Sequence, residues 1–250
     1  ALLIAMLPNV FAADTAGLDN FQKKNSYASG RFTDVADGAW YEENVKSAYE
    51  LGLMVGTSSS TFDPNGKLTI SQAVTIAARL HSIYNGNGDN FKQGKPWYQV
   101  YMDYAVSNHL ISEGEYPDPD VLATRAQYAV ILNAAFPDEA LTAINEISTI
   151  PDVTEDADYA DAVMRLYNAG ILNGTDSKGT FAPDKDITRA EVAAMVTRMA
   201  DPSLRMEFSI EGQPQTYTVT FDLNYANAAQ ATTVEVKAGE KIEKPTNPTR

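Results

Sequence analysis

Apolar side chains recur at helical spacing in three separate stretches of the chain, and each stretch begins directly after a threonine: Thr69, Thr124 or Thr188. In each stretch the apolar positions follow i, i+3, i+4 and i+7, the period that places side chains on one face of an α-helix. The predicted faces consist of Ala73, Ile76, Ala77, Leu80 and Ile83; of Tyr128, Ile131, Leu132 and Ala135; and of Val192, Met195, Val196 and Met199. A proline stands five residues before each threonine, so one unit is repeated three times along the chain.

The residue three positions after each threonine is Gln72, Gln127 or Glu191. This spacing is the signature of a capping box, in which the threonine hydroxyl accepts from the N3 amide and the N3 side chain accepts from the threonine amide. The threonines are therefore predicted to be the N-caps of three helices.

A second apolar pattern precedes each capped helix. Its members are Trp40, Val45, Ala48 and Tyr49 in the first copy, Trp97, Tyr98, Met102 and Ala105 in the second, and Tyr159, Val163, Leu166 and Tyr167 in the third. Gly52 and Gly170 follow the first and third patterns, where a glycine in the left-handed conformation ends a helix. His109 stands at this place in the second copy and adopts that conformation less readily, so this helix is expected to end differently.

The end of the chain has a different pattern. Residues 217–223 and 232–236 alternate in the manner of β-strands, and two strands alone are marginally stable, so this part is interpreted as a truncated module. A single helical unit of about 55 residues has too small a core to be stable alone. The predicted fold class is therefore mainly α, with three helical repeats packed around a shared axis and a short C-terminal β-rich fragment.

Residues 1–12 form an apolar run with the length of a signal-peptide core, followed by a small-residue cleavage pattern. A buried N-terminal strand or helix is the alternative. The division of the chain that follows is a signal peptide remnant (1–12), a linker (13–30), repeat 1 (31–88), repeat 2 with a bridging helix (89–149), repeat 3 (150–203), a second linker (204–216) and a truncated β-repeat module (217–250).

Charge narrows the choice of partner. The chain has 19 basic and 33 acidic residues, which gives a net charge of −14. Residues 31–203 hold 12 of the basic and 25 of the acidic residues. This balance argues against a nucleic-acid-binding protein and against electrostatic docking on an anionic membrane. The lack of cysteine excludes disulfides and thiolate metal sites, and two histidines leave little room for histidine-based catalysis.

Catalytic motifs are also missing from the sequence. There is no nucleophile elbow, phosphate-binding glycine loop or His-Glu-x-x-His zinc motif. Asp63, Asn65 and Gly66 resemble the start of a calcium loop, but the bidentate glutamate that would complete it is missing. We therefore predict no enzymatic activity, no metal and no cofactor.

The sequences FTDV at 32–35 and IPDV at 150–153, the Trp40–Tyr41 pair, GLMVG and GILNG, and LTISQ, ATRAQ and ITRAE together resemble the S-layer homology module. The ordered set covers residues 31–201. The resemblance implies a three-repeat helical domain with pseudo-threefold symmetry. It also implies non-covalent attachment of exported proteins to the bacterial cell wall, chiefly in Gram-positive species, through a secondary cell-wall polysaccharide that often carries pyruvylated N-acetylmannosamine. Residues 217–250 resemble the opening half of the internalin B-repeat, or Listeria–Bacteroides repeat.

In the family that this sequence resembles, the arginine of the TRAE-type segment contacts the ligand. The matching residues are Arg125 and Arg189, whereas the first copy has Ile70. The first turn of a helix suits an anion because free amides and the positive end of the helix dipole point outward, and arginine can hold a carboxylate by two parallel hydrogen bonds. At most two strong sites are expected, in grooves that override the general negative field. In the alternative interpretation, these arginines bridge to acidic neighbours such as Asp120 or Asp186.

Five further residues are candidate ligand contacts. Trp40 and Trp97 either stack on the sugar or anchor the core at the repeat junctions. Gln72, Gln127 and Glu191 are included, although helix capping is the stronger interpretation for them.

The predicted function is non-covalent anchoring of an exported surface protein to the cell wall. The predicted partner is a cell-wall polysaccharide or a peptidoglycan-linked polymer, with no nucleic acid and no membrane contact in the mature form. S-layer-type self-association is one alternative. The other is a non-catalytic anchor of an extracellular polysaccharide-degrading enzyme.

Overall fold

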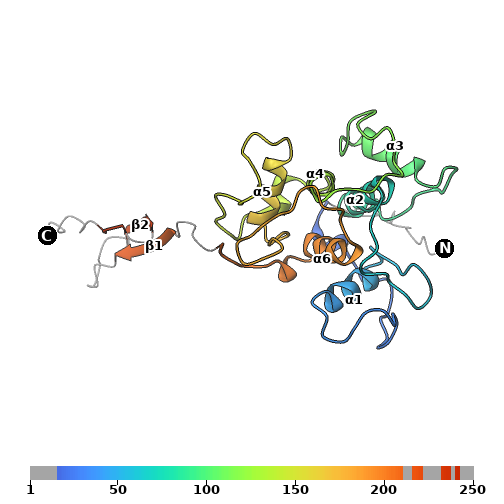
Figure 1. Cartoon of the computed structure of the whole chain (residues 1–250), viewed down its shortest axis with the longest axis horizontal. Helices are drawn as coiled ribbons and strands as arrows, with labels where there is room; N and C mark the ends of the chain where they lie inside the picture. Colours follow the sequence, from blue (N-terminus) through green and yellow to red (C-terminus); the bar gives the residue numbers. More distant parts are fainter. Residues whose placement is uncertain (1–15, 211–215, 222–231, 238–239, 243–250) are drawn as a thin grey trace, which may run out of the picture.

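The computed structural model describes residues 16–210, 216–221, 232–237 and 240–242. Within them lie α1 (Glu42–Glu50), α2 (Ile70–Tyr84), α3 (Gln99–Ser107), α4 (Arg125–Asn133), α5 (Ala160–Asn168) and α6 (Arg189–Ala200), and three 3-10 turns, η1 (Leu18–Asn20), η2 (Asp138–Leu141) and η3 (Pro202–Leu204). Two strands, β1 (Thr216–Phe221) and β2 (Thr232–Lys237), form an antiparallel pair beside the helical body (Figure 1). The predicted fold class, mainly α with a short C-terminal β-rich fragment, is confirmed.

The two predicted strands form, with Tyr217 opposite Val236 and Val219 opposite Val234. Positions 222 and 223 of the first predicted strand lie outside the described residues, as does the predicted signal peptide remnant at 1–12.

All three predicted capping boxes are present. The hydroxyls of Thr69, Thr124 and Thr188 accept from the amides three residues on, and the side chains there accept from the threonine amides in return. Gly52 and Gly170 have the expected positive φ, 70° and 71°. The expectation that the second copy ends its first helix differently is wrong, because His109 also has φ 59°.

The three copies meet in a closed ring of backbone hydrogen bonds. The amide of Leu68 donates to the carbonyl of Ile187 at 3.3 Å, Ile187 donates to Ala123 at 3.0 Å, and Ala123 donates back to Leu68 at 2.9 Å. Each of these residues directly precedes a capping threonine and is buried. The ring therefore holds three helix N-termini together in a cyclic order.

The helix amides next to this ring also cross from copy to copy. The N1 amides of Ile70, Arg125 and Arg189 each donate at 2.9 Å to a loop carbonyl of another copy, and the N2 amides donate to the carbonyls of the repeated prolines. The N3 amides donate to the capping threonines. The prediction that free amides of the first turn point outward is therefore wrong, because these amides are used to join the copies.

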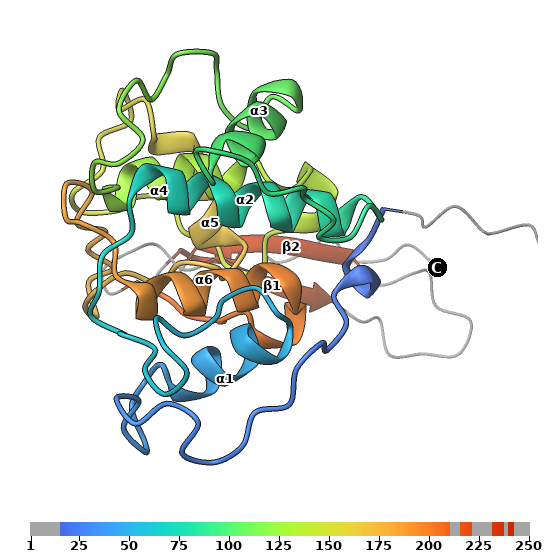
Figure 2. The same cartoon turned by 90° about the vertical axis from the view of Figure 1, so that its right-hand side faces the viewer.

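Helix packing follows the same cyclic order. Helix α6 packs on α1, α2 on α3, and α4 on α5, and Figure 2 shows α6 lying along α1. Polar contacts accompany the pairs: Asn44 donates to Thr197 at 3.0 Å, and the hydroxyl of Tyr104 lies 2.9 Å from Nδ1 of His81. Each pair joins two different copies, so the copies share one continuous core.

The segments before the first and third copies dock on helix ends. The amides of Lys24 and Asn25 both donate to the carbonyl of Glu50, and those of Ile144 and Asn145 both donate to Asn168. The stretch expected to form a bridging helix thus contains only the 3-10 turn η2, followed by this extended segment. A helix there would remove the cover from the C-terminal end of α5.

No corresponding segment covers the second copy in the described part of the chain. Residues Ser107, Asn108 and His109 at the end of α3 are exposed, whereas the residues at the ends of α1 and α5 are at least partly buried. The carbonyl of Tyr104 near the end of α3 accepts instead from the side chain of Asn108, the C-cap residue of that helix, at 2.8 Å.

We predict that Asn145→Ala lowers the free energy of unfolding by about 2–3 kcal/mol, because the buried side-chain amide of Asn145 makes three hydrogen bonds to the backbone of other segments. It donates to the carbonyls of Tyr167 and Met206 and accepts from the amide of Phe208. The matched variant is Asn25→Ala, which removes one exposed bond to Tyr49 and should cost about 1 kcal/mol. Urea unfolding measures both, and equal losses would contradict the prediction.

We also predict that Tyr128→Phe raises the free energy of unfolding by about 1 kcal/mol. The Tyr128 hydroxyl is buried and has no hydrogen-bond partner among the described residues, and an unpaired buried hydroxyl is costly. Tyr167→Phe is the control, because that hydroxyl donates to the carbonyl of Gly179 at 3.0 Å and its loss should destabilise. Thermal unfolding of both variants tests the opposite signs.

Candidate functional site

A pocket of about 690 Å³ lies where all three copies meet on one side of α6. The first copy contributes Trp40, Tyr41 and Asn65, and the second contributes Arg125. The third contributes the loop at 171–175, Lys185 and one face of α6. The volume lies in the range of pockets that hold small organic ligands.

One end of the pocket holds a buried ion pair. Arg125 Nη1 lies 2.9 Å from Glu191 Oε1, and their side chains are only 4% and 14% exposed. Lys185 Nζ lies 3.6 Å from the same oxygen, with its side chain 52% exposed. Arg125 Nε also donates to the carbonyl of Phe181 at 2.7 Å, and the guanidinium lies 5.2 Å from the centre of that ring.

Several effects act on the Glu191 carboxyl. Burial works to raise its pKa, but hydrogen bonds from Thr188 and the charges of Arg125 and Lys185 outweigh burial, so the pKa is lowered. Glu191 is therefore a carboxylate at neutral pH, and it serves as both a helix cap and an ion-pair partner.

The other end of the pocket holds a second arginine. Arg198 donates to the carbonyl of Ile171 at 2.8 Å and to the side chain of Asn173 at 3.3 Å, and it contacts Met206 Sδ at 2.8 Å. Burial lowers the pKa of this guanidinium. The pocket lining thus has three basic side chains and one acidic side chain.

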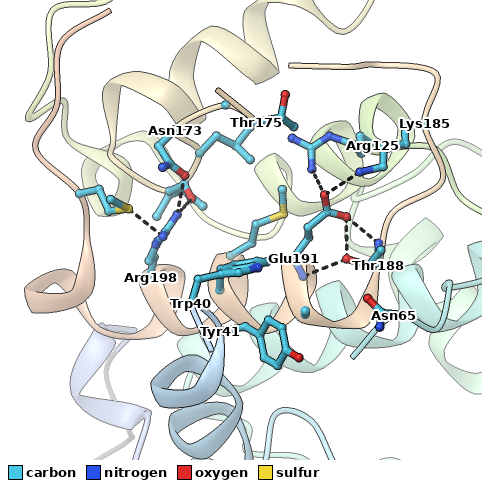
Figure 3. A pocket seen from close by; sticks show the side chains of 17 residues that line it. Trp40, Tyr41, Asn65, Arg125, Asn173, Thr175, Lys185, Thr188, Glu191 and Arg198 are labelled. Atoms are coloured by element: carbon cyan, nitrogen blue, oxygen red, sulfur yellow. Dashed lines mark hydrogen bonds and ion pairs between the residues drawn. The ribbon is translucent and has the colours of Figure 1, made fainter. Parts of the chain in front are cut away.

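Trp40 lies between these two ends, above α6 (Figure 3). Its side chain is 62% exposed, and Trp97 is 45% exposed. Each tryptophan packs edge-on against the following tyrosine. The alternative that these residues anchor the core is therefore wrong, because both rings are open to solvent and available for stacking.

The structure brings three of the seven predicted site residues together in the pocket, namely Trp40, Arg125 and Glu191. The other four, Arg189, Trp97, Gln72 and Gln127, do not line it. Gln72 and Gln127 act as helix caps, as expected.

Arg189 lies at the corresponding junction between the third and first copies. Its Nε donates to the carbonyl of Phe62 at 2.7 Å, and its Nη2 donates to Val55 at 2.6 Å. Burial lowers its pKa, although the charges of Asp63 and Asp34 oppose this. The alternative interpretation, in which the two arginines bridge to Asp120 or Asp186, is wrong. Arg125 pairs with Glu191, and within the described ranges Arg189 forms no ion pair.

The junction that Ile70 serves has a different character. Ile70 is fully buried in the core, and Asp158 stands where the other copies have a tryptophan. A hydrophobic side chain in place of the arginine gives this junction no guanidinium at the helix start.

Asn173, Lys185 and Arg198 also line the pocket and are not among the residues predicted from the sequence. A signal for Arg198 was present, since it lies ten residues after Thr188, just as Arg79 follows Thr69. Arg79 likewise donates to loop carbonyls, those of Gly52 and Leu53. Lys185 has no such counterpart, and only the fold shows that it faces Glu191.

Comparison with known families identifies two of the copies. The family described as "S-layer homology domain" matches residues 31–74 and 149–193. The chain contains S-layer homology domains. The matched segments end at the fifth residues of α2 and α6, and the intervening copy is the one that departs most from the pattern.

Similar proteins carry comparable regions. A surface-layer 125 kDa protein of Lysinibacillus sphaericus is 28% identical over 85% of this chain and 19% of its own length. An endoglucanase of Bacillus sp. is 25% identical over 79% of the chain and 21% of its own length. An amylopullulanase of Thermoanaerobacterium thermosulfurigenes is 26% identical over 69% of the chain and 10% of its own length. The chain thus spans about a fifth or less of each relative.

These matches indicate a protein of the cell surface that is exported and associated with the cell wall. Across the described ranges, none of the helices combines the length and the apolar character needed to cross a membrane.

We predict that Arg125→Ala lowers the free energy of unfolding by about 3–5 kcal/mol, because it leaves the largely buried Glu191 without its main partner. Arg189→Ala should cost less, about 1–2 kcal/mol, because it removes hydrogen bonds to carbonyls and no ion pair. Denaturant unfolding of both variants measures the difference. A larger loss for Arg189→Ala would show that the ion pair contributes little to the fold.

Proposed function

We propose that this chain anchors an exported protein to the bacterial cell wall by binding an acidic secondary cell-wall polysaccharide in the pocket along α6. The observation that carries the proposal is a pocket lined by Arg125, Lys185, Arg198 and one carboxylate, within a body that carries 12 basic and 25 acidic residues. A pocket with an excess of positive charge on an acidic protein attracts an anionic ligand, so this local charge favours an acidic sugar as the ligand.

The chemistry of the lining fits a sugar that carries a carboxylate, such as the pyruvylated N-acetylmannosamine implied by the family. Lys185 is half exposed and can reach the ligand without unfolding any part of the site. The Trp40 ring offers an exposed flat surface for the apolar face of a sugar. Arg198 and Asn173 supply polar groups at the far end of the pocket.

The junction at Arg189 is the second binding position in this proposal. Trp97 corresponds there to Trp40, and Arg189 to Arg125. Two positions on one rigid body gain affinity for a repetitive polymer because the second contact is intramolecular. The whole stretch acts by binding and carries out no reaction.

Two other functions keep specific support. The similarity to a surface-layer protein favours self-association, and the similarities to an endoglucanase and an amylopullulanase favour an anchor for a polysaccharide-degrading enzyme. An anchor for a polysaccharide-degrading enzyme would bind the wall in the same way, and only the anchored protein would be different. An export signal at 1–12 and a β-repeat at 217–250 would complete such a surface protein.

The test is co-sedimentation of the chain with purified wall sacculi before and after chemical extraction of the secondary polymer. We expect pelleting that is lost with the polymer and that falls about tenfold in Trp40→Ala and in Lys185→Ala, which corresponds to about 1.4 kcal/mol. Lys178→Ala is the charge-matched control, because Lys178 is exposed and lies outside the pocket.

Equal pelleting with stripped walls would identify peptidoglycan as the ligand and contradict the acidic-sugar proposal. Failure to pellet with any walls, combined with ordered assembly of the chain alone, would favour self-association.

A further inference from the structure

We propose that Glu191 is a built-in competitor of the acidic ligand, which weakens binding of that ligand at Arg125. This inference rests on the proposed function. It names the side chain that limits the affinity of the Arg125 pocket.

The carboxylate of Glu191 already occupies the groups that an acidic ligand needs. Its Oε1 lies 2.9 Å from Arg125 Nη1 and 3.6 Å from Lys185 Nζ, and its Oε2 accepts from the amide and hydroxyl of Thr188. A second carboxylate entering this end of the pocket must share or displace these contacts, and it meets a negative charge (Figure 3). The competing group is covalently part of the site, so it is always present.

The Arg189 junction has the same construction without this carboxylate. Each arginine is the first residue of its helix, donates through Nε at 2.7 Å to a phenylalanine carbonyl, and lies over that phenylalanine ring. By the cyclic order of the copies, Gln72 is the residue at the Arg189 junction that corresponds in position to Glu191 at the Arg125 pocket. Gln72 is uncharged, and its side-chain oxygen accepts from the amide of Thr69 at 3.0 Å.

The two junctions also differ in other charges. Arg79, the counterpart of Arg198, pairs with Asp89 at 2.6 Å, and Gly66 stands at the place of Lys185. Glu191 is the carboxylate that contacts its arginine directly. Asp34 accepts from the amides of Phe62 and Asp63, and Asp152 accepts from those of Phe181 and Ala182, so these two carboxylates are equivalent at the two sites. Asp63 acts on Arg189 and has no acidic counterpart, since Ala182 takes its place. Among the described residues it forms no ion pair with Arg189, whereas Glu191 pairs directly with Arg125.

The chain itself shows that the exchange between glutamate and glutamine is tolerated at this position. Glutamine at 72 and glutamate at 191 both complete capping boxes with their threonines. Glu191→Gln and Gln72→Glu therefore change the charge facing each arginine and retain the cap. The two substitutions are reciprocal controls for one another.

The experiment titrates the whole chain and both variants with the methyl glycoside of pyruvylated N-acetylmannosamine and with its uncharged carboxamide. The Nε–Hε signals of Arg125 and Arg189 in nitrogen-15 NMR spectra report the two sites separately. We expect Glu191→Gln to tighten binding of the acidic probe at Arg125 by about tenfold, the scale of one charge-assisted hydrogen bond. Gln72→Glu should weaken binding at Arg189 by a similar factor, and the carboxamide should respond to neither change.

Unchanged or weaker binding of the acidic probe at Arg125 in Glu191→Gln would overturn the competitor role, even if the wild-type chain pellets with walls. Tighter binding of both probes would also overturn it, because the effect would then be steric. The proposed function fails by a different result, namely a wild-type chain that binds neither the probe nor wall sacculi, and in that case the competitor role fails with it.

Discussion

The ring of hydrogen bonds among Leu68, Ala123 and Ile187 is the constraint on which the rest of this fold depends. It joins the residues that directly precede three helix caps, so it sets the positions of α2, α4 and α6 together. The N1 and N2 amides of these helices then donate across the copies. The first two amides of α2, α4 and α6 are thereby satisfied by a neighbouring copy.

The same ring creates the candidate site. Because each arginine at a helix start is directed toward the loop of the next copy, Arg125 reaches Glu191 and Phe181, which belong to the third copy. Trp40 arrives from the first copy, whose α1 packs on α6. The pocket therefore exists only when three copies close around the axis, although its residues are spread over more than 160 positions of the sequence.

Divergence among the copies gives the three junctions different chemistry on one scaffold. Ile70 fills the core where the other copies present arginine, and Gln72 holds in the first copy the capping position that Glu191 holds in the third. The uncovered end of α3 shows a similar divergence outside the pocket. The backbone is thus nearly symmetric while the side chains at the three junctions differ. This is possible because the ring of hydrogen bonds uses only main-chain groups and does not depend on these side chains.

The sequence by itself determined the local features of this protein. Hydrophobic period, the threonine caps and the left-handed glycines depend on neighbours within four residues, so they could be predicted, as could the two strands near the end. The tertiary structure alone decided what those elements face. Burial of Arg125 against Glu191, the use of the helix amides between copies, the docking of Asn145 and the place of Lys185 in the pocket all depend on contacts between copies. The spacing of residues along the chain does not predict such contacts, because they depend on how the three copies are arranged around the ring of hydrogen bonds.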